Sequence, residues 1–291
     1  MMTNSIDIAS AEGAVRKRYV KNSIFKGVVV SLTVIAILPL IFILYYIIKK
    51  GITSISWTFL TQLPKPVGET GGGILNAIVG SAIIISVASL IAIPFSVAIG
   101  IYLSEFPKTR LAYWTRLCID VLQGIPAIVV GIVIYIWVVK PMGGFSAISG
   151  SIAIALMMLP AITKATEETL IRVPAGLKEA SFSLGASYFQ TTVRALLPAA
   201  MNGILSGIIL SIARVAGEAA PLLFTAFGNP YLSANLAKPI SSIPLLIFNY
   251  SISPYEDWQK LAWGASFVLI SFILLLNILT KIAEKRWKVR Y

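Results

Sequence analysis

Long apolar runs with few charged residues constrain the fold of this chain more than any other feature. They lie at about 27–48, 74–103, 118–139, 145–162, 203–227 and 261–280. A helix needs roughly 20 consecutive apolar residues to cross a bilayer, and most of these runs reach that length. Only 12% of the residues are charged, whereas soluble chains carry about 25%. The sequence therefore predicts an all-α polytopic membrane protein with six transmembrane helices.

The segments between the runs give the predicted domain boundaries. Residues 1–26 are polar and basic and lack the apolar core and cleavage site of a signal peptide, so they predict a tail. A first span and an outer loop follow at 27–73. Residues 74–280 then form the main transmembrane domain, and 281–291 form a second basic tail. Within the third run, Pro126 removes a backbone hydrogen bond, and a bend is expected there.

The distribution of Lys and Arg predicts which side of the membrane each segment occupies. Residues 1–26 hold five, 104–117 three, 163–202 four and 281–291 five. The outer segments at 49–73, 140 and 228–260 hold six in all. Cytoplasmic loops carry an excess of positive charge, so both termini are expected in the cytoplasm.

Several kinds of chemistry are excluded by what the sequence lacks. There is no histidine and only one cysteine, Cys118, so zinc sites, histidine-based catalysis and disulfide frameworks are not expected. No G-x-x-x-x-G-K segment is present that would bind ATP. The net charge of +12 is spread between apolar runs, which argues against nucleic acid as a partner. The chain is thus expected to be no enzyme, with no catalytic residue, no metal and no cofactor.

Residues 173–198, between the fourth and fifth runs, have the pattern of two short helices. The first ends at Gly185. Ser187 and Gln190 stand at capping-box spacing and begin the second, whose end Pro198 marks. A hairpin of this kind can project from the membrane and offer an apolar ridge to a soluble partner. The alternative is an amphipathic loop that lies on the lipid surface.

Two charged residues, Arg214 and Glu218, lie within the fifth run. On one continuous helix they share a face with Ser211 and Thr225. A charge at the bilayer centre costs about 2.5–3.5 kcal/mol, so both side chains should face protein or water. The guanidinium presents donors in a planar fork that fits oxyanions. The pattern predicts an anion pathway lined by these four residues; alternatively, the two charges neutralise each other inside a packed bundle.

The hairpin resembles a known signature. Glu179-Ala180-Ser181, then Gly185 and Leu197-Pro198, is similar to the E-A-A, glycine, L-P signature of permease subunits of ABC-type importers. Ser181 stands where these permeases usually have a second alanine, and Ala195 where they usually have isoleucine. The resemblance implies a type I ABC importer permease fold in which 173–198 is a cytoplasmic coupling-helix hairpin that docks on an ATPase subunit. The residues implied for coupling are Glu179, Ala180, Ser181, Gly185, Leu197 and Pro198.

A second resemblance is more specific. The run A-R-V-A-G-E-A-A-P-L-L-F-T at 213–225 is similar to A-R-x-x-G-E-T-A-P-L-L-F-T of the PstA family of phosphate permeases, with Ala219 in place of the usual threonine. Shorter runs at 56–61, 72–74, 76–80 and 124–131 are also similar, and the likeness covers about residues 51–280.

This resemblance implies a permease subunit of an ATP-driven phosphate importer in a bacterial or archaeal plasma (inner) membrane. The implied partners are a second permease (PstC-like), a dimer of ATPase subunits (PstB-like) and an external phosphate-binding protein (PstS-like) that docks on 49–73 and 228–260. Three alternatives stay open at this point. They are an ABC permease for another oxyanion such as sulfate or molybdate, an ion-driven secondary transporter, and a scaffold that only senses phosphate.

Overall fold

The computed structural model describes residues 8–69 and 71–286, and these are helical apart from turns and connecting segments. The chain divides into two compact units, Met1–Lys49 and Lys50–Tyr291, which are described separately. Five helices are long and apolar enough to cross a membrane, or six if one bent pair counts as a span, within the described residues. The predicted all-helical membrane architecture is confirmed.

The first unit is a single helix. Helix α1 (Ile8–Gly51) is continuous and contains Pro39 without breaking. The candidate span Arg18–Ser54 begins within α1 and ends three residues after it. The predicted first span at 27–48 lies inside this helix. The predicted tail at 1–26 is in part helical, because the helix already begins at Ile8; residues 1–7 lie outside the described part.

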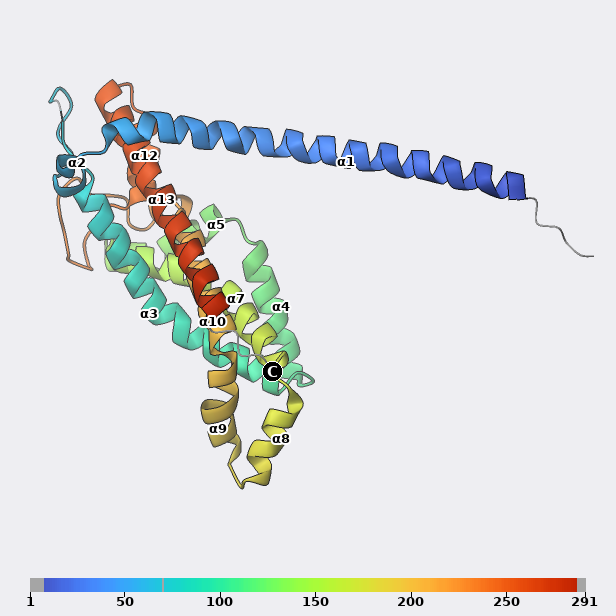
Figure 1. The fold of residues 1–291 in the computed structure, drawn as a ribbon. Coiled ribbons are helices and arrows are strands. Elements are labelled where there is room, and N and C mark those ends of the chain that lie inside the picture. The colour runs from blue at the N-terminus through green and yellow to red at the C-terminus, as the bar shows by residue number, and fades with distance from the viewer. Residues whose placement is uncertain (1–7, 70, 287–291) are drawn as a thin grey trace, which may run out of the picture. The chain divides into compact units, whose positions relative to one another are not determined.

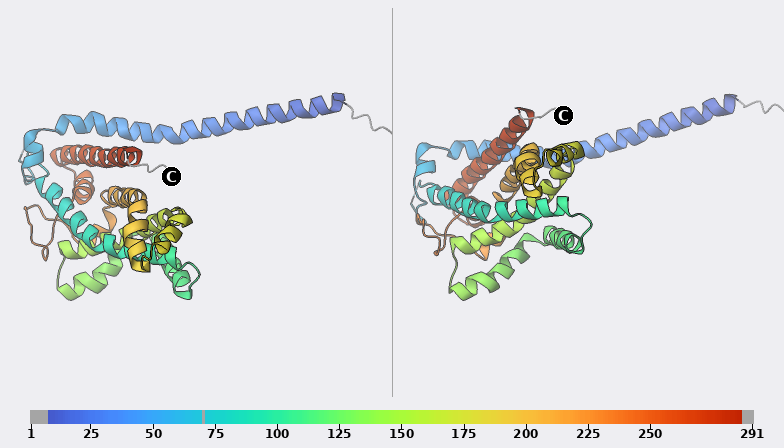
Figure 2. Two further views of the ribbon diagram at one scale, coloured as in Figure 1. Left: turned by 60° about the horizontal axis from the view of Figure 1, so that its bottom comes forward. Right: turned by 90° about the horizontal axis from the view of Figure 1, so that it is seen from below.

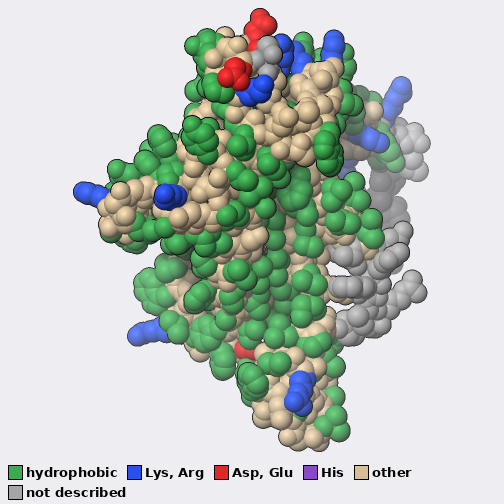
Figure 3. All heavy atoms as spheres, turned by 90° about the vertical axis from the view of Figure 1, so that its left-hand side faces the viewer, with side chains coloured by type: hydrophobic (Ala, Val, Ile, Leu, Met, Phe, Trp, Pro, Cys, Tyr) green, Lys and Arg blue, Asp and Glu red, His purple; other side chains and the backbone are tan. Residues whose placement is uncertain are grey.

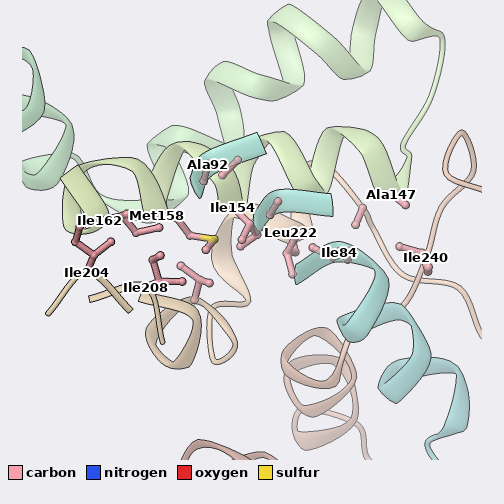
Figure 4. Packing of buried hydrophobic residues seen from close by; sticks show 14 of the residues in the cluster. Ile84, Ala92, Ala147, Ile154, Met158, Ile162, Ile204, Ile208, Leu222 and Ile240 are labelled. Atoms are coloured by element: carbon pink, nitrogen blue, oxygen red, sulfur yellow. The ribbon is translucent and has the colours of Figure 1, made fainter. Parts of the chain in front are cut away.

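The second unit is built around three long helices: α3 (Leu75–Glu105), α7 (Ala147–Ile171) and α10 (Leu197–Val215). Helix α7 lies between the other two and contacts both (Figures 1 and 2). Their buried side chains form one continuous core, in which Ile84 of α3, Met158 of α7 and Ile204 of α10 are almost fully buried (Figure 4). Helix α13 (Glu256–Arg286) packs against α10.

The remaining helices are short. Near the start of the unit, η1 (Ile52–Ser54) and α2 (Trp57–Thr61) precede α3. The predicted outer segment at 228–260 holds α12 (Ile243–Ser251), which is packed against α3 and α13 and not exposed as a loop. The others are α4 (Arg110–Gly124), α5 (Ala127–Ile134), the π-helical turn η2 (Tyr135–Val139), α6 (Lys140–Met142), α8 (Ala175–Ser183), α9 (Tyr188–Thr191), the π-helical turn η3 (Thr192–Leu196) and α11 (Ala220–Leu223).

The third predicted span is a broken pair of helices. Helices α4 and α5 meet at an angle of 105°. Pro126 has no N–H and disfavours the helical conformation of the residue before it, and Ile125 is accordingly extended at φ −72° and ψ 130°. The predicted bend is confirmed, and it divides the predicted span at 118–139 between α4 and the helices that follow it. Thr109 caps a helix that already starts at Arg110.

Two further predicted spans end at other residues than predicted. Helix α7 begins at Ala147 and continues to Ile171, nine residues beyond the predicted end at 162. Helix α10 ends at Val215, so the predicted span at 203–227 is interrupted. After Val215 the N–H groups of Gly217 and Glu218 donate to the carbonyls three residues earlier, in tight turns that leave the α-helical pattern. Pro221 lies at the start of the short α11.

Apolar side chains dominate the middle of the surface seen in Figure 3, whereas charged side chains stand toward its ends and left edge. This distribution fits a unit that lies in a bilayer with its ends in water.

Candidate functional site

The first candidate site is the hairpin formed by α8 and α9, which lies at one end of the second unit (Figure 1). Gly185 joins the arms with φ +80°, a conformation that glycine adopts without steric cost. The Ser187 side chain accepts from the backbone N–H of Gln190, while the Gln190 side chain accepts from that of Ser187. The predicted hairpin and its capping box are therefore confirmed.

The second arm does not end where the sequence suggested. Pro198 is the second residue of α10, and the helix continues through it from η3. The π-helical turn just before Pro198 changes the hydrogen-bond register, so the missing N–H and the ring are tolerated. As a consequence, the hairpin runs directly into the long helix α10.

The tip and outer face of the hairpin are apolar and exposed. Leu184 is 89% exposed and Phe189 75%, and Glu179 and Ala180 of the predicted coupling set are exposed as well. Ser181 is half-buried, and its hydroxyl lies 2.9 Å from that of Thr191 on the other arm. The serine that departs from the usual alanine thus links the two arms. Among the other predicted coupling residues, Gly185 and Pro198 are exposed and Leu197 is half-buried.

The second candidate site is a cavity of about 110 Å³ at the break between α4 and α5. Its wall is apolar except for two side chains, Gln123 of α4 and Arg214 of α10. Pro160 of α7 also lines it. The lining comes from four different helices, so the cavity depends on the 105° bend and on the position where α10 ends. Its residues are Leu122, Gln123, Ile125, Val129, Val130, Val133, Leu156, Met157, Pro160, Ala161 and Arg214.

The predicted four-residue stripe is wrong. Arg214 lies in the last turn of α10 and is exposed, whereas Glu218 follows the end of that helix and is half-buried. No hydrogen bond or ion pair joins them, and over residues 8–69 and 71–286 Arg214 has no side-chain partner. Neutralisation of one charge by the other is therefore absent from this structure. A positive charge in the last turn is favoured by the helix dipole.

The other two predicted pathway residues point into the protein. Ser211 is buried, and its hydroxyl lies 3.5 Å from the carbonyl oxygen of Met158. Thr225 is fully buried and donates to the carbonyl of Pro221 at 2.8 Å. The carbonyl of Thr225 also accepts from the Ser149 hydroxyl of α7. Because α10 ends at Val215, the periodicity that placed Thr225 beside Arg214 does not apply. Ser211 is on the same helix as Arg214, but its hydroxyl faces Met158 of α7.

Two polar residues at the cavity, Gln123 and Lys164, were not singled out from the sequence. Lys164 of α7 donates to the side-chain oxygen of Gln123 at 2.6 Å and lies 2.6 Å from the carboxylate of Asp120. Asp120 and Gln123 are three residues apart on α4, and Lys164 is four residues after Pro160 on α7. These spacings are visible in the sequence, but only the packing of α4 on α7 brings the groups together.

Comparisons with known proteins agree with this fold. Residues 92–289 match the family described as binding-protein-dependent transport system inner membrane component. A phosphate transport system permease protein PstA from Yersinia pestis is 42% identical over 244 residues, which cover 84% of this chain and 83% of the relative. Its counterpart from Haemophilus influenzae is 38% identical and covers 91% and 94%.

The solved structure of the MetNI methionine ABC transporter in inward facing conformations is similar in fold. Its TM-score is 0.53 at 19% sequence identity, covering 74% of this chain and 92% of that one. The chain therefore belongs to the family of binding-protein-dependent transport system inner membrane components and, within it, to the PstA permease proteins.

Proposed function

We propose that this chain conducts inorganic phosphate as one half of the translocation pathway of an ATP-driven importer. As a family member it is a non-catalytic, multi-pass permease component of the inner membrane. Its similarity to named phosphate permeases supports phosphate as the substrate. The observation that carries the pathway role is Arg214, an exposed guanidinium without a side-chain partner in the described chain that lines the cavity at the α4–α5 break.

The chemistry of this cavity suits weak, passing contact with an anion. The guanidinium of Arg214 offers several donors that match phosphate oxygens. Apolar walls strengthen this interaction, while the absence of a second free cation on the wall keeps it releasable. Lys164, held by Asp120 and Gln123, supplies a further positive charge close to the same wall. In this proposal Glu218 does not neutralise the charge of Arg214.

The proposed orientation places the hairpin and both termini in the cytoplasm. The excess of Lys and Arg in the segments on that side supports it. The partners are a second permease (PstC-like), two ATPase subunits (PstB-like) that receive the hairpin, and an external phosphate-binding protein (PstS-like). Family membership supports ATPase and binding-protein partners in general.

The proposed mechanism is alternating access. Closure of the ATPase dimer moves the hairpin, whose exposed apolar tip is suited to a cleft in a soluble partner. The hairpin is joined in sequence to α7 and α10, so its movement reorients the two helices that carry Pro160 and Arg214. Opening of the cavity then alternates between the two sides of the membrane.

The test is ATP-dependent phosphate uptake by proteoliposomes that contain all four components. Arg214→Ala should lower uptake at least about tenfold, since a hydrogen-bonded charge contributes roughly 1.5–3 kcal/mol. Arg214→Lys should retain part of the activity, because it keeps the charge but not the fork. The matched control is Arg172→Ala, which removes an arginine that is 78% exposed and paired only with Glu168. Full uptake by the assembled Arg214→Ala complex would show that the pathway lies elsewhere.

The same preparation separates the alternatives. Competition by sulfate or molybdate as strong as that by unlabelled phosphate would identify a permease for another oxyanion. Uptake that persists without ATPase subunits but needs an ion gradient would identify a secondary transporter. No uptake by a complete, ATP-hydrolysing complex would favour a sensing scaffold.

A further inference from the structure

The base of the hairpin meets the end of α3 at one carboxylate, that of Glu105. Lys178, on the first arm, forms an ion pair with this carboxylate. Tyr188, on the second arm, donates its hydroxyl hydrogen to the same oxygen. A single acidic group therefore joins both arms of the hairpin to a third helix that is far from them in sequence.

The carboxylate of Glu105 does not stabilise α3 itself. It is the last residue of α3, where the negative end of the helix dipole disfavours a carboxylate. Its side chain is only 8% exposed, and burial of an unpaired carboxylate is costly. Within the described residues, the two donors from the hairpin offset both costs. The group is thus adapted to the contact between α3 and the hairpin.

Aromatic rings hold this contact in one geometry. The ring of Tyr188 contacts those of Phe182 on α8 and of Phe106 directly after α3, with centroids 6.3 and 5.9 Å away. The ammonium of Lys178 lies 5.2 Å from the centre of the Tyr188 ring. These ring contacts and the ammonium limit the rotation of the Tyr188 side chain.

The same end of α3 is also tied to the cavity side of the bundle. Arg116 of α4 donates to the carbonyls of Leu103 and Pro107 at 2.9 and 3.0 Å. It forms an ion pair with Glu167 of α7 at 2.7 Å. Helix α4 carries Gln123 in the cavity wall. Polar contacts therefore join the end of α3 to the hairpin through Glu105 and to α4 through Arg116.

We propose that Glu105 is a positioning residue for coupling: it transmits movement of the hairpin to α3 and, through Arg116, to the α4 wall of the cavity. This inference rests on the proposed function. The hairpin is joined in sequence to α7 and α10, so its movement displaces two walls of the cavity. Glu105 couples the same movement to a third wall, that of α4. Without Glu105 the ATPase dimer still closes, but the walls no longer move together.

The test measures phosphate taken up per ATP hydrolysed by the reconstituted four-component complex. Glu105→Gln keeps the shape and an acceptor oxygen but loses the charge, and should lower this ratio roughly tenfold while ATP hydrolysis is retained. Tyr188→Phe removes one donor, keeps the aromatic packing and should lower the ratio about threefold. Glu168→Gln is the matched control, because this glutamate is 66% exposed on the same side of the unit and should not change the ratio.

Loss of uptake with ATP hydrolysis retained is a readout that a purely structural role does not predict, and charge reversal tests whether the Glu105–Lys178 ion pair is its cause. Glu105→Lys and Lys178→Glu should each uncouple ATP hydrolysis from uptake, and the double variant should restore at least part of the ratio. If Glu105→Gln does not assemble, Tyr188→Phe decides. An unchanged ratio in an assembled Glu105→Gln or Tyr188→Phe complex overturns the proposal. Failure of the unmodified complex to take up phosphate would instead contradict the proposed function itself.

Discussion

At the scale of single residues, glycines on the neighbouring helices determine how closely α7 approaches them. A Cβ added at Gly207 of α10 would lie 2.3 Å from the Cβ of Ala165, and one at Gly100 of α3 would lie 2.6 Å from the Cβ of Thr166. Small residues of this kind let membrane helices pack closely, where dispersion contacts supply much of the association energy. Gly207 is therefore a packing position between α10 and α7.

Gly207→Ala should therefore destabilise the folded permease. The added methyl group overlaps Ala165, and relief of an overpacked contact costs about 1–3 kcal/mol. Thermal unfolding of the detergent-solubilised complex measures this loss. The control is Gly124→Ala, a position with nothing within 4 Å of an added Cβ, where alanine should be neutral or slightly stabilising. Equal unfolding temperatures for the two variants would contradict a close α7–α10 contact.

Residues whose interactions are local could be predicted from the sequence, and those with distant partners could not. The capping box of Ser187 and Gln190 closes within four residues, so its spacing alone predicts it. The hairpin around Gly185 was predictable for the same reason. The grouping of Arg214 with Glu218 required an uninterrupted helix and failed where α10 ends. The Glu105 contact links α3 to residues more than seventy positions away and leaves no local pattern.

At the scale of elements, the break between α4 and α5 shapes the cavity most directly. The sequence predicts a bend at Pro126, but its size of 105° follows from tertiary packing. At Gly131 of α5, an added Cβ would lie 2.8 Å from Pro221 at the start of α11, so α5 is pressed against the segment that follows α10. The break between α4 and α5 and the break after α10 therefore lie on either side of one contact, that between α5 and α11. Periodicity within either span does not contain this information.

Pro126→Ala should weaken this break. Alanine lets Ile125 adopt helical angles and adds conformations to the unfolded chain, so the folded state should lose about 1 kcal/mol and uptake should fall severalfold as the cavity is less often formed. The comparison is Pro94→Ala in α3, where proline lies inside an unbroken helix at an exposed position. Uptake by proteoliposomes measures both. Equal uptake would show that packing against α11 fixes the bend without the proline.

At the scale of the whole molecule, the side of the membrane that is rich in Lys and Arg must also be the side on which the hairpin lies. The coupling hypothesis requires the hairpin to face the ATPase in the cytoplasm, and the count of Lys and Arg predicts this independently. The segment between α11 and α12 should then face the opposite side, where the binding protein docks. Each of these regions has an exposed residue that can be labelled. Leu184 of the hairpin is 89% exposed, and Tyr231 between α11 and α12 is 74% exposed.

Labelling of single cysteines by a membrane-impermeant maleimide tests this orientation. Cys118 is exposed and would react, so it is first replaced by serine. Leu184→Cys should label in inside-out vesicles and Tyr231→Cys in right-side-out vesicles, because the reagent reaches only the face that it contacts. ATPase subunits added to inside-out vesicles should protect the cysteine at 184 and leave the one at 231 unaffected. Labelling of position 184 from outside would contradict the orientation, the docking of the hairpin and the coupling route through Glu105 together, since all three need this hairpin on the side where ATP is hydrolysed.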